Sequence, residues 1–158
     1  MPEITVFELS EVAGLLHLSS STVKNWTIGR PLSIQPSIRA EGGTGSRNLY
    51  GRDDVCLFAL VTQLTRDGFA TRTLKHVLEE LAVLKEREGG LAPVLAHYST
   101  LVISSPHERT KVQFLAGDLT TAVHEQLRED VRGCYILDLT KLVKWVELRI
   151  KHFVEVPF

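Results

Sequence analysis

The sequence predicts a mainly α-helical first half that includes a β-hairpin, followed by a small α+β unit. Apolar residues repeat at helical spacing in several segments before residue 89, and a stretch rich in glycine and proline, 29–50, interrupts them. Beyond residue 90, short apolar runs alternate with amphipathic segments, as in strands and helices that follow one another. The chain has 158 residues, of which 44% are hydrophobic, so it can bury a core without metals or disulfides. We expect two domains, at 1–89 and 90–158.

Two short helices are expected near the N-terminus. Apolar residues over 9–16 fall on one helical face, and Ser19 is a favourable N-cap for a second helix that ends near Trp26. Val23 and Trp26 can face the first helix, which leaves a polar outer face made of Ser21, Thr22, Lys24 and Asn25. Two helices joined by a three-residue turn fit the major groove of DNA, and the same polar face is also typical of an ordinary solvated helix.

A β-hairpin is predicted after the helix pair. Pro31 and Pro36 exclude a helix there, and strands at 33–39 and 46–50 can be joined by the glycine-rich segment 41–45. Arg39 and Arg47 lie one on each strand. This arrangement favours a winged helix-turn-helix, with a plain surface turn as the alternative reading of the glycine run.

Two longer helices complete the first domain. One begins at Asp53 or Asp54, runs to Asp67-Gly68 and is apolar around much of its circumference, so we expect it to be buried. Thr71 is expected to cap the next helix, which ends near Gly89-Gly90. Its apolar stripe consists of Leu74, Val77, Leu78, Leu81 and Leu84.

The C-terminal half is expected to contain three strands and two helices. The strands centre on 101–103, 112–115 and 135–137, one helix covers 120–130, and Asp138 caps the final helix. That helix carries an apolar stripe of Leu139, Leu142, Val143, Val146, Ile150 and Phe153. The stripe is either an intrachain core face or a dimer seam, and we slightly favour the seam.

The positive charge is concentrated in one segment. The net charge is −1, but residues 17–52 carry five Lys and Arg against one Asp or Glu. A local cationic segment matters more for binding phosphates than the total charge.

Metal, redox and catalytic sites are not predicted. Cys56 and Cys134 stand far apart among apolar residues, so we expect two buried thiols, and the six histidines have no ligand spacing. We find no nucleophile elbow or phosphate-binding loop and expect no cofactor and no enzymatic activity. The absence of a signal pattern and of a long apolar segment leads us to expect a cytoplasmic protein without a membrane partner.

Residues 7–81 resemble the DNA-binding domain of the MerR family of transcription regulators. The motifs that carry the resemblance are Leu9-Ser10-Glu11-Val12-Ala13, Leu18-Ser19, Thr22-Val23-Lys24-Asn25-Trp26, Arg47-Asn48-Leu49-Tyr50, Asp54-Val55, Gly68-Phe69 and Leu74-Lys75. The segment from Ile28 to Ser46 is longer than the wing that is usual in the family.

The resemblance implies a DNA-binding face. Thr22, Lys24 and Asn25 would enter the major groove, Arg39 and Arg47 would grip the flanking backbone, Tyr50 would anchor the wing or touch a phosphate, and Trp26 would lie in the core. The full expected set of DNA-binding residues is Ser21, Thr22, Lys24, Asn25, Arg30, Arg39, Thr44, Ser46, Arg47 and Tyr50.

The expected function is sequence-specific binding of double-stranded DNA by a transcription regulator, as a homodimer on an inverted repeat. The alternative is a DNA-binding interaction protein, such as the antitoxin of a toxin pair or a phage DNA-packaging or architectural protein. In that case residues 90–158 would bind another protein.

Overall fold

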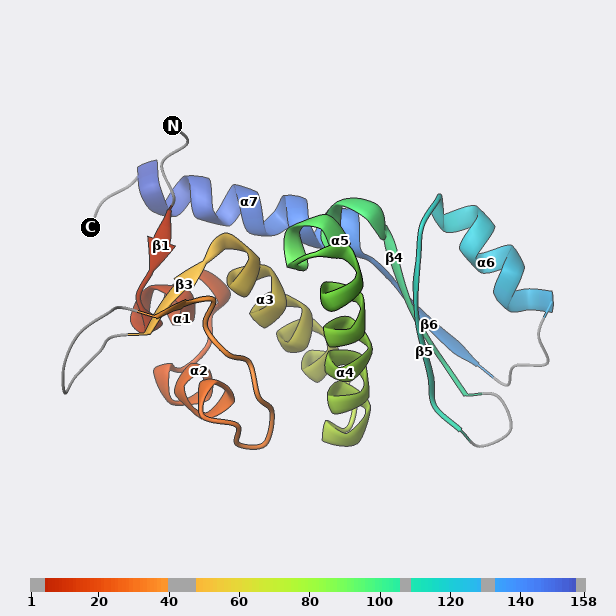
Figure 1. The fold of residues 1–158 in the computed structure, drawn as a ribbon, viewed down its shortest axis with the longest axis horizontal. Helices are drawn as coiled ribbons and strands as arrows, with labels where there is room; N and C mark the ends of the chain where they lie inside the picture. The colour runs from red at the N-terminus through yellow and green to blue at the C-terminus, as the bar shows by residue number, and fades with distance from the viewer. Residues whose placement is uncertain (1–4, 40–47, 106–108, 129–132, 156–158) are drawn as a thin grey trace. The chain divides into compact units, whose positions relative to one another are not determined.

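The computed structural model describes residues 5–39, 48–105, 109–128 and 133–155, which belong to two compact units (Figure 1). The first unit combines Met1–Leu74 with the C-terminal stretch Trp145–Phe158, and the second unit is Lys75–Lys144. The units therefore divide within two helices, whereas the sequence suggested a division at Gly89-Gly90. The fold is mixed α and β, with long helices and two small antiparallel sheets.

The first unit contains a three-stranded antiparallel sheet in the order β1-β3-β2 and the helices packed against it. In this sheet Phe7 pairs with Tyr50, and Arg39 pairs with Asn48. The elements are β1 (Val6–Phe7), α1 (Leu9–Leu16), α2 (Ser20–Thr27), β2 (Ile38–Arg39), β3 (Asn48–Gly51), α3 (Arg52–Arg66), the start of α4 (Thr71–Glu88) and the second half of α7 (Leu139–Glu155).

Helix α3 forms the centre of the first unit. Nearly every residue from Asp54 to Leu64 is buried, because apolar side chains occupy almost the whole circumference of the helix. The prediction of a buried helix here is confirmed. The helices expected at 9–16 and from Ser20 to near Trp26 are also present, with ends within a residue of those predicted.

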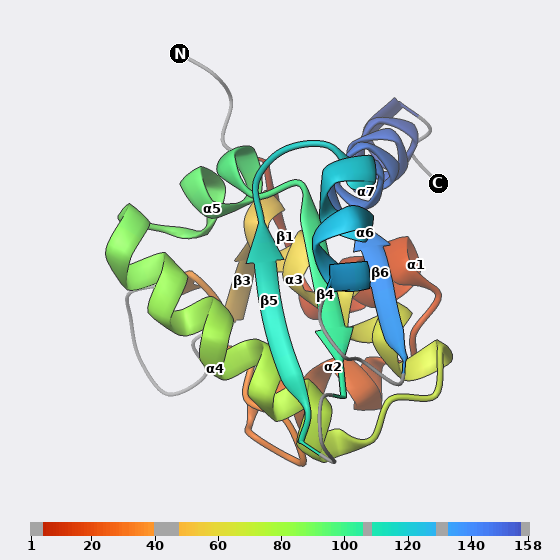
Figure 2. The ribbon, with the colours of Figure 1, turned by 90° about the vertical axis from the view of Figure 1, so that its right-hand side faces the viewer.

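The second unit has its own three-stranded antiparallel sheet, in the order β5-β4-β6. The central strand β4 (Thr100–Ser104) is buried along its whole length and pairs with β5 (Lys111–Leu115) and β6 (Cys134–Asp138). Helix α6 (Leu119–Arg128) contacts β6, and Figure 2 shows it in front of the sheet. The three predicted strands and the helix over 120–130 are therefore confirmed in outline.

Two local features of the second unit differ from expectation. Helix α5 (Leu91–His97) was not predicted, because Gly89-Gly90 indicated a boundary between domains and no element was expected directly after it. The third residue of this helix is Pro93. Proline is tolerated in the first turn of a helix, where its missing N–H has no partner to lose. Cys134 is exposed rather than buried, because it is the first residue of the edge strand β6.

Helix α7 begins as predicted, since the Lys141 N–H donates to the Asp138 carboxylate at 2.9 Å. Its apolar stripe is a core face for at least part of its length, contrary to the slight preference for a dimer seam. Leu139 and Val146 are buried, and the ring of Phe153 packs edge-on against Phe7 with centroids 6.4 Å apart. These residues of the stripe are packed within the chain and so do not contact a second copy through this face.

Candidate nucleic-acid interface

Helices α1 and α2 form a tightly connected pair. Only three residues join them, and α1 ends at His17, whose φ of 53° places it in the left-handed region. The Leu18 N–H then donates to the Ala13 carbonyl at 2.9 Å, which closes the helix end. Ser19 caps α2, because its hydroxyl oxygen accepts from the Thr22 N–H at 3.1 Å. The cap predicted at Ser19 is confirmed.

The C-terminal end of α1 is bound by arginines from two distant parts of the chain. Arg149 of α7 donates to the Leu15 carbonyl at 3.1 Å and also contacts the ring of His17. Arg66 of α3 donates to the Leu16 carbonyl at 3.4 Å. Cations at a helix C-terminus satisfy free carbonyls and interact favourably with the helix dipole. The turn between α1 and α2 is thus held by α3 and α7.

The inner face of α2 packs into an aromatic cluster. Trp26 stacks on Phe58 with ring centroids 6.1 Å apart, and Tyr50 meets Phe58 edge-on at 5.7 Å. Trp26 is buried, as expected, and the Tyr50 hydroxyl lies 2.8 Å from the Thr27 hydroxyl, which itself donates to the Val23 carbonyl. Burial raises the pKa of Tyr50 above its ordinary value. Of the two roles expected for Tyr50, anchoring the strand to α2 fits this geometry, whereas contact with a phosphate does not.

The outer face of α2 divides into a capping part and a solvent-facing part. The hydroxyls of Ser21 and Thr22 lie 2.9 and 2.8 Å from the Ser19 hydroxyl, so both take part in the cap. Lys24 and Asn25 are exposed one turn further along. The sequence has no Asp or Glu between Glu11 and Glu41, so the surroundings of this face carry no carboxylate from their own segment.

The end of α2 is fixed by a glycine in the left-handed region. Gly29 has a φ of 86°, and the Arg30 N–H donates to the Asn25 carbonyl at 2.8 Å, as in a Schellman motif. Arg30 is exposed directly after this turn. Ile28, the C-cap residue, is also exposed, and it is not among the residues expected from the sequence to contact DNA.

The predicted strand over 33–39 is much shorter in the structure. Side chains alternate between exposed and buried from Pro31 to Ser37, but only Ile38 and Arg39 pair with β3. Pro36 has no N–H to offer a ladder, and the N–H and hydroxyl of Ser37 donate to the Asp54 carboxylate at 3.0 and 2.6 Å.

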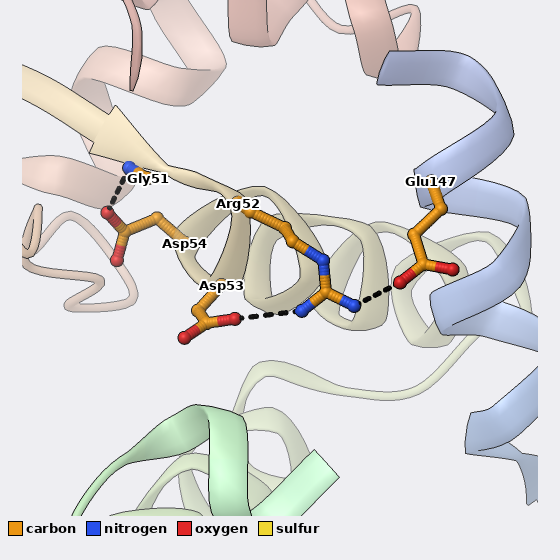
Figure 3. A network of polar contacts seen from close by, with 5 residues as sticks. All are labelled: Gly51, Arg52, Asp53, Asp54 and Glu147. Carbon is orange, nitrogen blue, oxygen red and sulfur yellow. Dashed lines mark hydrogen bonds and ion pairs between the residues drawn. The ribbon is translucent and has the colours of Figure 1, made fainter. Parts of the chain in front are cut away.

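The buried side chain of Asp54 in α3 links the segment 31–37 to the end of β3 (Figure 3). The oxygen that accepts from Ser37 also accepts from the Gly51 N–H at 2.8 Å. One carboxylate therefore fixes the start of α3 and the chain that leads into β2. Several hydrogen-bond donors offset the cost of burying a carboxylate. Removal of the carboxylate would leave the Ser37 N–H and hydroxyl and the Gly51 N–H without this acceptor.

One cation of the positive segment is already neutralised. Arg52 forms an ion pair with Asp53 at 3.2 Å and a second with Glu147 of α7 (Figure 3). The hydrogen bond to Glu147 raises the pKa of Arg52 further above its usual value. Arg52 thus serves to tie α7 to α3. Lys24 and Arg30 are exposed cations of the positive segment 17–52.

The structure brings part of the predicted DNA-binding set together. Ser21, Thr22, Lys24, Asn25 and Arg30 lie on or directly after α2, and the backbone of Arg39 belongs to β2. Thr44, Ser46 and Arg47, and with them the tip of the predicted wing, lie outside the described residues.

Comparisons with known proteins do not assign a family. No protein-family model matches the chain, and a search of curated proteins finds no relative. Among the described residues, no His, Cys, Asp and Glu side chains gather in a group of three or more that could hold a metal. In the same part of the chain, every helix is too short or too polar to cross a membrane.

Proposed function

We propose that this chain is a sequence-specific, double-stranded DNA-binding transcription regulator of the MerR type. In this proposal α1 and α2 form the helix-turn-helix, α2 enters the major groove, and the β2–β3 pair with its connection forms the wing. Arg39 and Arg47 are assigned to flanking phosphates, and so is Arg30, which is exposed directly after α2. The protein binds an inverted repeat as a homodimer, and the second unit provides contacts to the other copy or to an effector.

The observation that carries the proposal is the division of α2 into two faces. Its inner face is anchored by Trp26 and Thr27, and its outer face presents Lys24 and Asn25 to solvent in a segment free of carboxylates. An amide can form a bidentate contact with adenine and an ammonium can bind guanine or phosphate, so these groups suit a base-reading helix. Because Trp26 stacks on Phe58 of α3 and the Thr27 hydroxyl bonds that of Tyr50, the direction of the outer face is fixed relative to the core of the first unit.

Selection of bound DNA tests the proposal directly. The full chain is mixed with random-sequence duplexes, and the bound fraction is recovered, amplified and sequenced. We expect one enriched motif with two-fold symmetry, because a dimer presents two copies of α2. Failure to enrich any motif over several rounds would refute the proposal.

Two variants then separate base reading from phosphate binding. Asn25→Ala should weaken binding to the enriched duplex by about 1–3 kcal/mol per protomer and hardly change binding to random DNA, because a base contact discriminates. Arg30→Ala should weaken both alike and lower the salt dependence by roughly one unit per protomer, because one fewer counterion is released. Lys85→Ala, an exposed lysine of α4 in the second unit, is the matched control and should change neither. Equal losses on both duplexes for Asn25→Ala would mean that α2 does not read bases.

A further inference from the structure

An isoleucine stands at the C-terminal end of the exposed face of α2. Ile28 is 54% exposed. It follows Ser21 by seven residues, Lys24 by four and Asn25 by three, so the four side chains lie on one side of the helix. Val23 and Trp26, on the opposite side, are buried. Ile28 therefore projects in the same direction as the two residues assigned to DNA contact.

The position of Ile28 is held by the backbone on both sides of it. Its N–H donates to the Lys24 carbonyl at 3.0 Å, and the turn at Gly29 and Arg30 follows immediately. The neighbouring apolar residues Trp26 and Leu32 are turned inward, with exposed fractions of 8% and 1%. A β-branched side chain has few rotamers, so its methyl groups are presented in a defined direction.

We propose that Ile28 contacts the 5-methyl group of a thymine and thereby selects an A·T pair at one fixed position in each half-site. This inference rests on the proposed function. In the major groove thymine is the base that presents an apolar group, whereas the edges of the other bases present hydrogen-bond donors and acceptors. An isoleucine pressed against such an edge would leave a polar group without water or partner, which costs binding energy. The same side chain against a methyl group buries apolar surface on both sides.

Replacement of thymine by deoxyuridine tests this contact, because deoxyuridine keeps the base pairing and lacks the methyl group. Each thymine of one half-site of the enriched duplex is replaced in turn, and the dissociation constant of the full chain is measured at fixed salt. We expect one position at which the wild-type protein binds about fourfold more weakly, the factor that one buried methyl group is worth. Ile28→Ala should bind the thymine duplex more weakly by about the square of this factor, roughly 16-fold, because both protomers lose the contact, and it should be insensitive to deoxyuridine at that position.

The control variant is Val154→Ala, which truncates a similarly exposed apolar side chain of α7 and should keep the full sensitivity to deoxyuridine. Circular dichroism spectra of both variants that equal the spectrum of the wild type establish that Ile28→Ala is folded. The inference is overturned if Ile28→Ala still responds to loss of the methyl group, or if the enriched half-site contains no thymine. A protein that enriches a motif but fails these tests retains the proposed function, whereas a protein that enriches no motif loses both.

Discussion

At the scale of single residues, burial determines the reactivity of a side chain, which differs between residues of the same type. The two cysteines have similar apolar neighbours in the sequence, yet Cys56 is buried on α3 and Cys134 is exposed at the start of β6. Burial raises the pKa of the Cys56 thiol to about 12. The thiolate is the reactive form, so the two thiols should differ sharply in reactivity.

Thiol labelling should therefore modify one cysteine in the folded protein and both in the unfolded protein. At pH 8 a group with a raised pKa near 12 remains protonated, and raising the pH to 9 should still leave Cys56 unmodified. Titration with an aromatic disulfide reagent counts the reactive thiols. Cys134→Ser should abolish labelling of the folded chain, and Cys56→Ser should leave it at one equivalent. Labelling of two thiols per chain in the folded wild-type protein would contradict the burial of Cys56.

At the scale of elements, the ends of α1 and α2 show how local backbone geometry fixes the helix pair. Gly14 lies inside α1, where an added Cβ would meet nothing within 4 Å. Gly29 follows α2 at a φ of 86°, where side chains other than that of glycine are strained. The same residue type thus weakens one helix and terminates the other.

The same substitution should have opposite effects at these two glycines. Gly14→Ala should raise the free energy of unfolding by about 0.5–1 kcal/mol, because alanine favours the helix and restricts the unfolded chain. Gly29→Ala should lower the free energy of unfolding by about 1–2 kcal/mol, because alanine pays the cost of the left-handed conformation. Urea unfolding curves with a common slope measure both changes. A loss of stability in Gly14→Ala would mean that the outer side of α1 is covered in solution.

At the scale of the whole molecule, α7 belongs to both units. Its first residues follow β6 in the second unit, and from Trp145 onward it packs in the first unit, where Glu147 contacts Arg52 and Arg149 binds the end of α1. The first unit is therefore incomplete without the C-terminal residues. Trp145 and Leu148 nevertheless remain 40% and 59% exposed, three residues apart on this helix.

We expect the protein to be a homodimer in solution and Trp145 and Leu148 to take part in the contact. Two-fold DNA sites require paired reading helices, and a patch of two large apolar side chains on each copy can be self-complementary. Light scattering should give twice the chain mass of 17.7 kDa for the wild type and a lower mass for the double variant Trp145→Ser/Leu148→Ser. The control Val83→Ser/Val154→Ser removes two exposed valines and should remain dimeric. A wild-type mass of one chain, unchanged by DNA, would exclude the dimer.

The sequence alone determined the features that depend on neighbours within about four residues. The ranges of α1 and α2, the cap at Ser19, the cap at Asp138 and the buried character of α3 follow from helical periodicity and local hydrogen bonds, and all are present in the structure. Of the residues expected on the outer face of α2, Lys24 and Asn25 face solvent, because a helical face is set by spacing, whereas the hydroxyls of Ser21 and Thr22 bond the cap at Ser19.

Only the tertiary structure decided which groups separated in sequence meet. The Asp54 carboxylate accepts a hydrogen bond from the Ser37 N–H, so the predicted strand is shorter. Glu147 forms an ion pair with Arg52, and the hydroxyls of Thr27 and Tyr50 are hydrogen-bonded to each other. From Trp145 onward the stripe of α7 is likewise covered within the first unit, where Val146 is buried and Phe153 packs against Phe7. The sequence shows which apolar face must be buried and which polar group needs a hydrogen-bond partner. It does not show the partner, because that depends on which distant segments of the chain the fold brings next to it.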